Sequence, residues 1–235
     1  MQVYFQLIRV RNLFIIALTM MGIYFFYAHF GNNIAFSVID HYHFALLVFV
    51  TILIAAAGNV INDIFDIKAD KFNKPDKVIV GEIITEENAT ILYWFLNASA
   101  LLIALYLSFF YKSLWLLIIP ISCFGALWIY SKRLKKISFI GNLLIAVLAA
   151  LVPLLTGVFV HEAFGLSGGV LNLDDISLNT IPTLSSTILI NGQNGLVFFF
   201  ALFAFLLNFS REWIKDIQDI EGDKLISSYS LAIQL

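Results

Sequence analysis

Six long apolar runs constrain this chain more than any other feature of its sequence. They cover residues 13–30, 44–62, 91–110, 114–130, 139–160 and 195–212. A helix needs about 20 mainly apolar residues to cross a bilayer, and each run meets or approaches that length. Strands of a membrane barrel would instead alternate apolar and polar residues over about ten positions. The runs therefore predict an all-α integral membrane protein, built as a multi-span helical bundle of about six spans.

Composition supports a membrane protein. Hydrophobic residues make up 60% of the 235 residues and charged residues 13%, and mean hydropathy is +0.90. A soluble domain of this length could not bury so much apolar surface. The first run follows Arg9 and Arg11 without a small-x-small cleavage pattern, so we expect a retained span rather than a signal peptide. We expect no nucleic-acid partner, because no basic stretch interleaved with aromatic residues is present.

Basic residues mark one side of the predicted bundle. Every Lys and Arg except Lys112 lies before the first run, at the end of the sixth run, or in the segments that follow the second, fourth and sixth runs. Segments 31–43 and 161–194, which fall on the other side, contain neither residue type. The positive-inside rule therefore predicts a cytoplasmic amino terminus.

An acidic stretch, NVINDIFDIKADKFNKPDK at residues 59–77, follows the second run. Asp63, Asp66 and Asp70 are spaced by three and then four residues, which places three carboxylates on one face of a helix. Asn62 lies one turn before Asp66. Carboxylates this close repel one another unless a cation lies between them. Mg²⁺ favours carboxylate and amide oxygens and is often shared with substrate phosphates, so the stretch predicts a magnesium site.

The same acidic spacing recurs after the sixth run, in REWIKDIQDIEGDK at residues 211–224. Here the carboxylates belong to Asp216, Asp219 and Asp223. Because an even number of spans separates the two motifs, both are expected on the cytoplasmic side, where they can face each other. Two opposed acidic faces favour one shared metal site over two unrelated solvated helix ends.

Together with the membrane helices, these motifs resemble the signature of the UbiA-type intramembrane prenyltransferases. That signature pairs N-D-x-x-D-x-x-x-D with a D-x-x-D-x-x-x-D-like stretch on the cytoplasmic side of a helical bundle. The resemblance implies Mg²⁺-dependent transfer of a polyprenyl group from a prenyl diphosphate to a lipid or aromatic acceptor. It implies catalytic roles for Asp66 and Asp219. The inner metal ligands would be Asn62, Asp66, Asp219 and Asp223, with Asp63, Asp70 and Asp216 as further ligands or orienting groups.

The resemblance extends to the segment YSKRLKK at residues 130–136. Tyr130 and Lys135 match the Tyr and Lys pair that follows the fourth span in the family, and Lys132 is an alternative to Lys135. Tyr130 would lie near the reacting end of the prenyl chain. Lys135, with Lys132 or Arg133, would contact the diphosphate. Lys74, beside the helix-stopping Pro75, is either a further diphosphate ligand or ordinary cytoplasmic charge.

The acceptor is suggested by Arg9 and Asn12 in IRVRNLF. They resemble an Arg-x-x-Asn pattern of the digeranylgeranylglyceryl phosphate synthase-type members, which prenylate a glycerol phosphate ether lipid. We therefore expect geranylgeranylglyceryl phosphate as acceptor, with an aromatic acceptor such as 4-hydroxybenzoate or a naphthoate as the alternative. An ion or solute transporter is the rival from another class. The acids cluster at helix ends rather than at the midplane, which disfavours transport.

The carboxyl end, LISSYSLAIQL, resembles the family's exit toward a seventh span, whereas complete members have nine spans. We therefore expect residues 1–235 to form a single transmembrane prenyltransferase domain that is incomplete at its C-terminus. Such a chain would have little activity unless a partner supplies the missing helices. The expected location is a bacterial or archaeal cell membrane.

Overall fold

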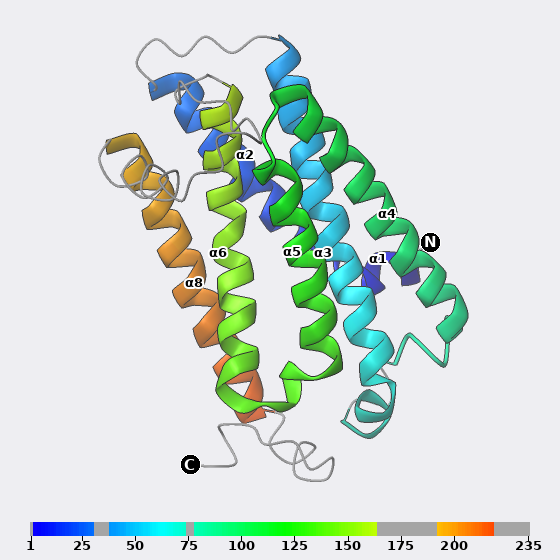
Figure 1. Cartoon of the computed structure of the whole chain (residues 1–235). Coiled ribbons are helices and arrows are strands. Elements are labelled where there is room, and N and C mark those ends of the chain that lie inside the picture. Colours follow the sequence, from blue (N-terminus) through cyan, green and yellow to red (C-terminus); the bar gives the residue numbers. More distant parts are fainter. Residues whose placement is uncertain (1, 31–37, 74–77, 164–191, 219–235) are drawn as a thin grey trace.

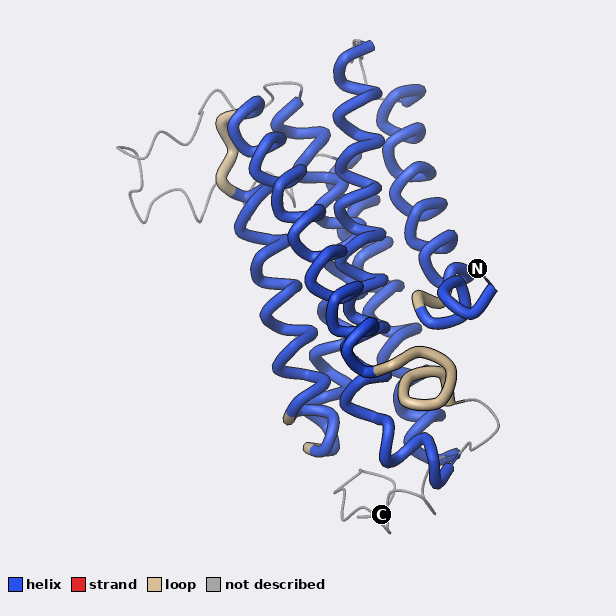
Figure 2. Tube along the Cα trace, turned by 90° about the vertical axis from the view of Figure 1, so that its right-hand side faces the viewer, coloured by secondary structure: helices blue, strands red, loops and turns tan. Residues whose placement is uncertain are grey.

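The computed structural model describes residues 2–30, 38–73, 78–163 and 192–218. Nearly all of these residues are helical, as Figure 2 shows. The elements are α1 (Gln2–Leu7), α2 (Val10–Phe30), α3 (Val38–Asn73), α4 (Glu86–Tyr111), α5 (Trp115–Lys132), the short 3-10 helix η2 (Leu134–Lys136), α6 (Ser138–Ala163) and α8 (Gly192–Gln218). An isolated bridge between Val80 and Ile84 is the one strand-like feature in the described residues. The predicted all-α class is confirmed.

Five helical segments are long and apolar enough to cross a membrane. They are Asp40–Lys68, Glu86–Tyr111, Trp115–Lys132, Phe139–Val160 and Gly195–Ile214. The expected first span corresponds to α2, which has 21 residues and whose described apolar stretch is Val10–Phe26. Five spans are therefore found in the described residues, and α2 lies where the sequence predicts the first of its six. The protein is an integral membrane protein.

The long helices lie side by side in one bundle (Figure 1). The end of α3, the start of α4, the turn between α5 and α6 and the end of α8 all lie at one end of this bundle, the lower end in Figure 1. Lys112 caps the opposite end of α4. The end of α3, which carries the first acidic motif, and the end of α8 thus lie at the same end of the bundle, as an even number of intervening spans requires.

Helix α3 is the central element, and it packs against α4 and α5. Small residues allow a close approach: Ala56 and Ala57 are buried, and a Cβ at Gly58 would lie 2.9 Å from a methyl carbon of Leu127 on α5. Small residues at helix interfaces are typical of membrane bundles, where packing rather than water exclusion holds helices together. Gly58 therefore fixes how closely α5 can lie against the acidic helix.

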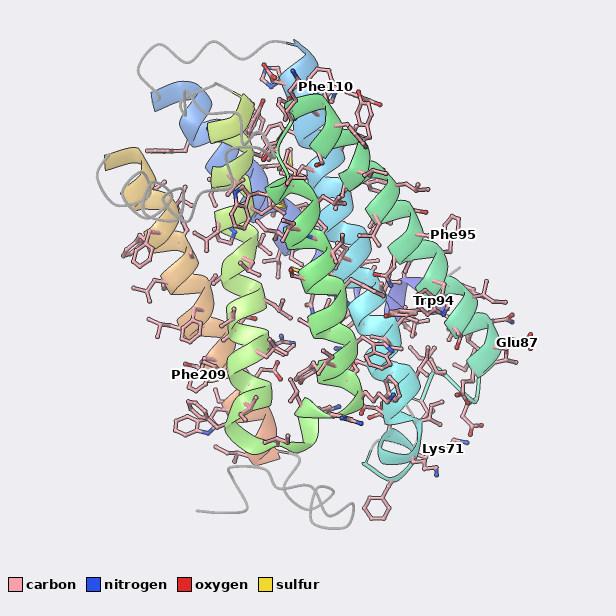
Figure 3. The ribbon with its side chains drawn as sticks, in the orientation of Figure 1. Lys71, Glu87, Trp94, Phe95, Phe110 and Phe209 are labelled. Carbon is pink, nitrogen blue, oxygen red and sulfur yellow. The ribbon has the colours of Figure 1, made fainter. Side chains whose placement is uncertain are left out.

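Large apolar side chains cover the outside of the bundle. Figure 3 shows Phe95 projecting outward from α4, and Trp94 and Phe95 are 56% and 66% exposed. At the end of the bundle away from the acidic motif, an aromatic core closes the interior, with Tyr24 stacked on Phe44 at 3.8 Å and Phe159 beside them. An apolar exterior with a packed aromatic interior suits a protein whose solvent is lipid.

Candidate active site

The first acidic motif lies in the last three turns of α3, beyond the close contact at Gly58. This 36-residue helix is about 54 Å long at 1.5 Å per residue, whereas the hydrocarbon core of a bilayer is about 30 Å thick. The excess length carries the motif toward the membrane boundary. Asn62, Asp63, Asp66 and Asp70 are all partly buried there, which is unlike a fully solvated helix end.

Asn62 and Asp66 interact as the helical spacing requires. The side-chain amide Nδ2 of Asn62 donates a hydrogen bond of 2.7 Å to Oδ2 of Asp66. Residues four apart lie on the same helix face, so this bond orients the carboxylate within the motif. It also leaves the amide oxygen Oδ1 of Asn62 as an acceptor on the same face.

Lys135 brings a cation to this carboxylate from a different part of the chain. Its ammonium forms an ion pair with Oδ2 of Asp66, with the two side chains 31% and 13% exposed. Lys135 belongs to η2, the 3-10 turn that joins α5 to α6. This turn packs tightly on α6, because a Cβ at Gly141 would lie only 2.7 Å from the backbone oxygen of Leu134. Glycine at 141 therefore sets the position of the turn that carries Lys135.

Arg9 brings a second cation to the motif. Its guanidinium Nη2 donates to Oδ1 of Asp63 at 2.7 Å. Arg9 occupies the corner between α1 and α2 in a left-handed conformation, with φ of 57°. The corner is anchored to α3 a second time, because Nδ2 of Asn59 donates to the backbone oxygen of Ile8 at 2.9 Å. These two bonds hold the amino-terminal corner against the acidic helix.

The other predicted site residues have separate surroundings. Asn12 is partly buried in the first turn of α2, where its backbone N–H donates to the backbone oxygen of Arg9 at 2.8 Å. Tyr130 is buried near the end of α5. The ammonium of Lys132 lies 4.3 Å from the ring centre of Trp128, and Arg133 lines the same cavity as these two residues. The structure thus brings Lys135, rather than Lys132, to the first motif.

Part of the predicted site lies outside the described residues. This holds for Lys74, Asp219 and Asp223 and for the side chain of Asp216, whose backbone lies in the last turn of α8. Within the described part of the chain, no three His, Cys, Asp or Glu side chains form a group that could hold a metal ion. The four predicted ligands on α3, Asn62, Asp63, Asp66 and Asp70, offer only carboxylate and amide oxygens. That donor chemistry fits Mg²⁺ and does not fit a metal that prefers sulfur or imidazole ligands.

Two contributions were not predicted from the sequence. One is the role of Asn59 in holding the α1–α2 corner, and the other is the close packing of Gly141 on the Lys135 turn. Asn59 lies one turn before the motif, and a polar residue at that position could have suggested a contact near the site. The packing role of Gly141 could not have been predicted, since a glycine near a helix start has many possible causes.

Comparison with known proteins matches this architecture to one family. The model of the UbiA prenyltransferase family matches residues 15–235. Among curated relatives, the digeranylgeranylglyceryl phosphate synthase of Thermococcus sibiricus is 28% identical over 204 residues, covering 86% of this chain and 60% of the relative. That of Sulfolobus acidocaldarius is 34% identical over 194 residues, covering 82% and 57%. The chain thus spans about three fifths of the length of these relatives.

A solved structure agrees with the sequence match. It is reported as "Structural and mechanistic insights into the biosynthesis of Digeranylgeranylglyceryl phosphate synthase in membranes", with a TM-score of 0.65 and 28% identity. The similarity covers 100% of this chain and 68% of that one. The family match extends over nearly the whole chain, and the similar structure shares its helical fold. This chain belongs to the UbiA prenyltransferase family.

Proposed function

We propose that this protein transfers a polyprenyl group from a prenyl diphosphate to geranylgeranylglyceryl phosphate, in ether lipid synthesis. The observation that carries the proposal is the meeting of Lys135 and Arg9 with the carboxylates of Asp66 and Asp63 at one end of a membrane bundle. Such a site combines groups for an anionic head with an apolar interior for a long tail. The similarity to curated digeranylgeranylglyceryl phosphate synthases supports this choice of acceptor.

In the proposed reaction, the bond between the allylic carbon and the diphosphate oxygen breaks, and a hydroxyl oxygen of the acceptor forms a new bond to that carbon. The hydroxyl proton is released, and diphosphate leaves. Asn62, Asp66, Asp219 and Asp223 would hold Mg²⁺, with Asp63, Asp70 and Asp216 supporting them. Bound Mg²⁺ would neutralise the negative charge that accumulates on the leaving diphosphate.

The protein's own cations would complement this role. Lys135 is held at the inner carboxylate by η2, so its ammonium can reach a diphosphate oxygen while remaining beside Asp66. Arg9 is oriented by Asp63 and would bind the phosphate of the acceptor together with Asn12. Tyr130, at the end of α5, would border the reacting end of the prenyl chain. Lys74 would be a further diphosphate contact.

The membrane location explains why the site lies at the end of a bundle. Exposing a polyprenyl tail to water costs about 0.8 kcal/mol per CH₂ group. A tail that stays between the helices avoids this cost while its diphosphate reaches the polar end of α3. We further propose that this end and the amino terminus face the cytoplasm of a bacterial or archaeal cell.

The test is an assay with purified protein, radiolabelled prenyl diphosphate and a panel of acceptors. We expect an ether-lipid product from geranylgeranylglyceryl phosphate, and loss of turnover when a chelator removes Mg²⁺. Products from 4-hydroxybenzoate or a naphthoate alone would support the aromatic alternative. Movement of an ion or solute without consumption of the diphosphate would support a transporter. Full turnover in excess chelator would contradict the metal proposal.

Single and double variants in the same assay test whether the two acidic motifs share one metal ion. Asp66→Asn and Asp219→Asn should each remove most activity, and the double variant should lose little more, because a shared ion needs both acidic faces. Glu87→Gln is the matched control. Glu87 is an exposed carboxylate at the start of α4, at the same end of the bundle (Figure 3). Multiplicative losses from the two Asp variants would indicate two independent sites.

A further inference from the structure

A cavity with a mainly apolar lining lies at the end of α5, apart from the acidic motif. It has a volume of about 290 Å³ and is lined by Trp128, Ile129, Lys132 and Arg133. Trp128 and Lys132 are four residues apart and share one side of the helix. Arg133 follows directly after the helix, where its backbone N–H donates to the backbone oxygen of Ile129. Leu127, in contrast, packs against Gly58 of α3. The cavity therefore opens on a different side of α5 from its interface with the acidic helix.

The two cations of this cavity differ from Arg9, Lys71 and Lys135 in what they contact. Arg9, Lys71 and Lys135 each pair with a carboxylate, at Asp63, Glu82 and Asp66 respectively. Lys132 and Arg133 form no such pair within the described residues. Lys132 is held over the ring of Trp128, where the aromatic face attracts its ammonium. Two neighbouring positive charges thus border one cavity without a carboxylate partner in that part of the chain.

The position of the cavity indicates the kind of molecule that would supply the missing negative charge. The membrane-spanning segment of α5 ends at Lys132, and Trp is typical of the boundary between hydrocarbon and head groups. Trp128 and Ile129 are 37% and 45% exposed and offer an apolar wall on the membrane side. At about 290 Å³ the cavity can hold a group much larger than one water molecule. A phosphate group joined to an apolar chain matches both the two cations and the apolar wall of this cavity.

We infer that Lys132, Arg133 and Trp128 bind the phosphate of an anionic membrane lipid, at a site separate from the acidic motif. The cations contact the phosphate, and Trp128 with Ile129 packs along the first carbons of the lipid chain. Basic residues at a membrane surface attract anionic lipids in this way. A simpler role for the same cations is interaction with the negative end of the α5 dipole, which would give no preference among lipids.

The two roles differ in lipid selectivity, which native mass spectrometry of the detergent-purified full chain measures directly. The protein is titrated with phosphatidylglycerol, which is anionic, and phosphatidylcholine, which is zwitterionic. We expect a preference for the anionic lipid that falls roughly tenfold in Lys132→Gln/Arg133→Gln. Lys68→Gln, which removes an exposed cation of α3 at the same end of the bundle, should keep the preference. An unchanged preference in the double variant would overturn the inference.

Two further measurements test whether the lipid preference has another cause. Soluble glycerol phosphate should not displace phosphatidylglycerol at equal concentration, and equal competition would show a site for free phosphate instead. If the double variant fails to fold, as judged by its circular dichroism, Lys132→Arg/Arg133→Lys is used. This variant keeps both charges and should keep the preference, whereas its loss would contradict the inference. Weaker binding of prenyl diphosphate with unchanged lipid selectivity would instead place both cations at the substrate.

Discussion

The ammonium of Lys135 and the carboxylate of Asp66 form an ion pair although 69 positions separate them in the sequence. The same carboxylate oxygen also accepts a hydrogen bond from Asn62. A divalent ion that coordinates this oxygen must compete with the lysine for it. The pair therefore links the affinity for metal to the position of η2.

Replacing Lys135 should consequently tighten metal binding while it weakens catalysis. We expect Lys135→Met to bind Mn²⁺, a spectroscopic substitute for Mg²⁺, roughly fivefold more tightly when no diphosphate is present, which corresponds to about 1 kcal/mol. The same variant should bind prenyl diphosphate less well. Electron paramagnetic resonance of Mn²⁺ measures the first effect without any turnover. Lys71→Met, which breaks a pair with Glu82 outside the motif, is the control, and unchanged or weaker Mn²⁺ binding in Lys135→Met would contradict the prediction.

Arg9 offers a test in which two substitutions remove the same ion pair but differ in backbone strain. Its φ of 57° lies in the left-handed region, which glycine adopts without penalty and alanine does not. We expect Arg9→Gly to be about 1 kcal/mol more stable than Arg9→Ala in thermal unfolding measured in detergent. Acceptor affinity should fall equally in both variants, because both lose the guanidinium. Equal stability would mean that the corner rearranges once the bond to Asp63 is gone.

Gly141 allows the position of Lys135 to be changed without removing any functional group. Alanine there would place a Cβ 2.7 Å from the backbone oxygen of Leu134, so η2 must shift. A displacement of this kind should lower the turnover rate roughly tenfold or more. Gly125→Ala on α5, where no atom outside the helix lies within 4 Å of the added Cβ, should retain normal turnover. Steady-state kinetics of the two variants, compared at equal expression, provide the measurement, and similar rates would show that the turn adapts.

The proposed orientation is tested by labelling from the two sides of intact membranes. The sole natural cysteine, Cys123, is first replaced by serine, and single cysteines are then placed at Lys71 or Lys112. These positions lie at opposite ends of the bundle. A membrane-impermeant maleimide should label position 112 in whole cells and position 71 only after the membrane is opened. The reverse pattern would place the acidic motif outside the cell.

Much of this site could be predicted because it depends on local spacing. The bond between Asn62 and Asp66 follows from helical periodicity, and the observed α3 contains the first motif as expected. The helices are longer than the apolar runs of the sequence, because hydropathy detects only the part of a helix that lies in lipid. Helix α4 begins at Glu86, earlier than its apolar run, since Thr85 caps it by accepting a bond from the backbone N–H of Asn88.

Other features depend on breaks in the helices that spacing does not reveal. In a continuous helix, Lys132 and Lys135 would lie on the same face, so the sequence could not choose between them. The chain turns at Arg133, where φ is −135° and ψ is −50°, and η2 then directs Lys135 to the acidic helix. The pairing of Arg9 with Asp63 likewise requires a left-handed corner, which nothing in IRVRNLF indicates.

One unbroken helix, α3, both crosses the bilayer and carries the carboxylates. The depth of the acidic face in the membrane and the direction in which it points therefore change together. An inserted residue between Ala57 and Asn62 would turn the acidic face by about 100° and advance it by about 1.5 Å. A tilt of α3 in a thinner membrane would likewise lower the carboxylates relative to the head groups. Lipid composition should thus act as a mechanical control on the acidic face, because bilayer thickness changes the depth of that face relative to the hydrocarbon core.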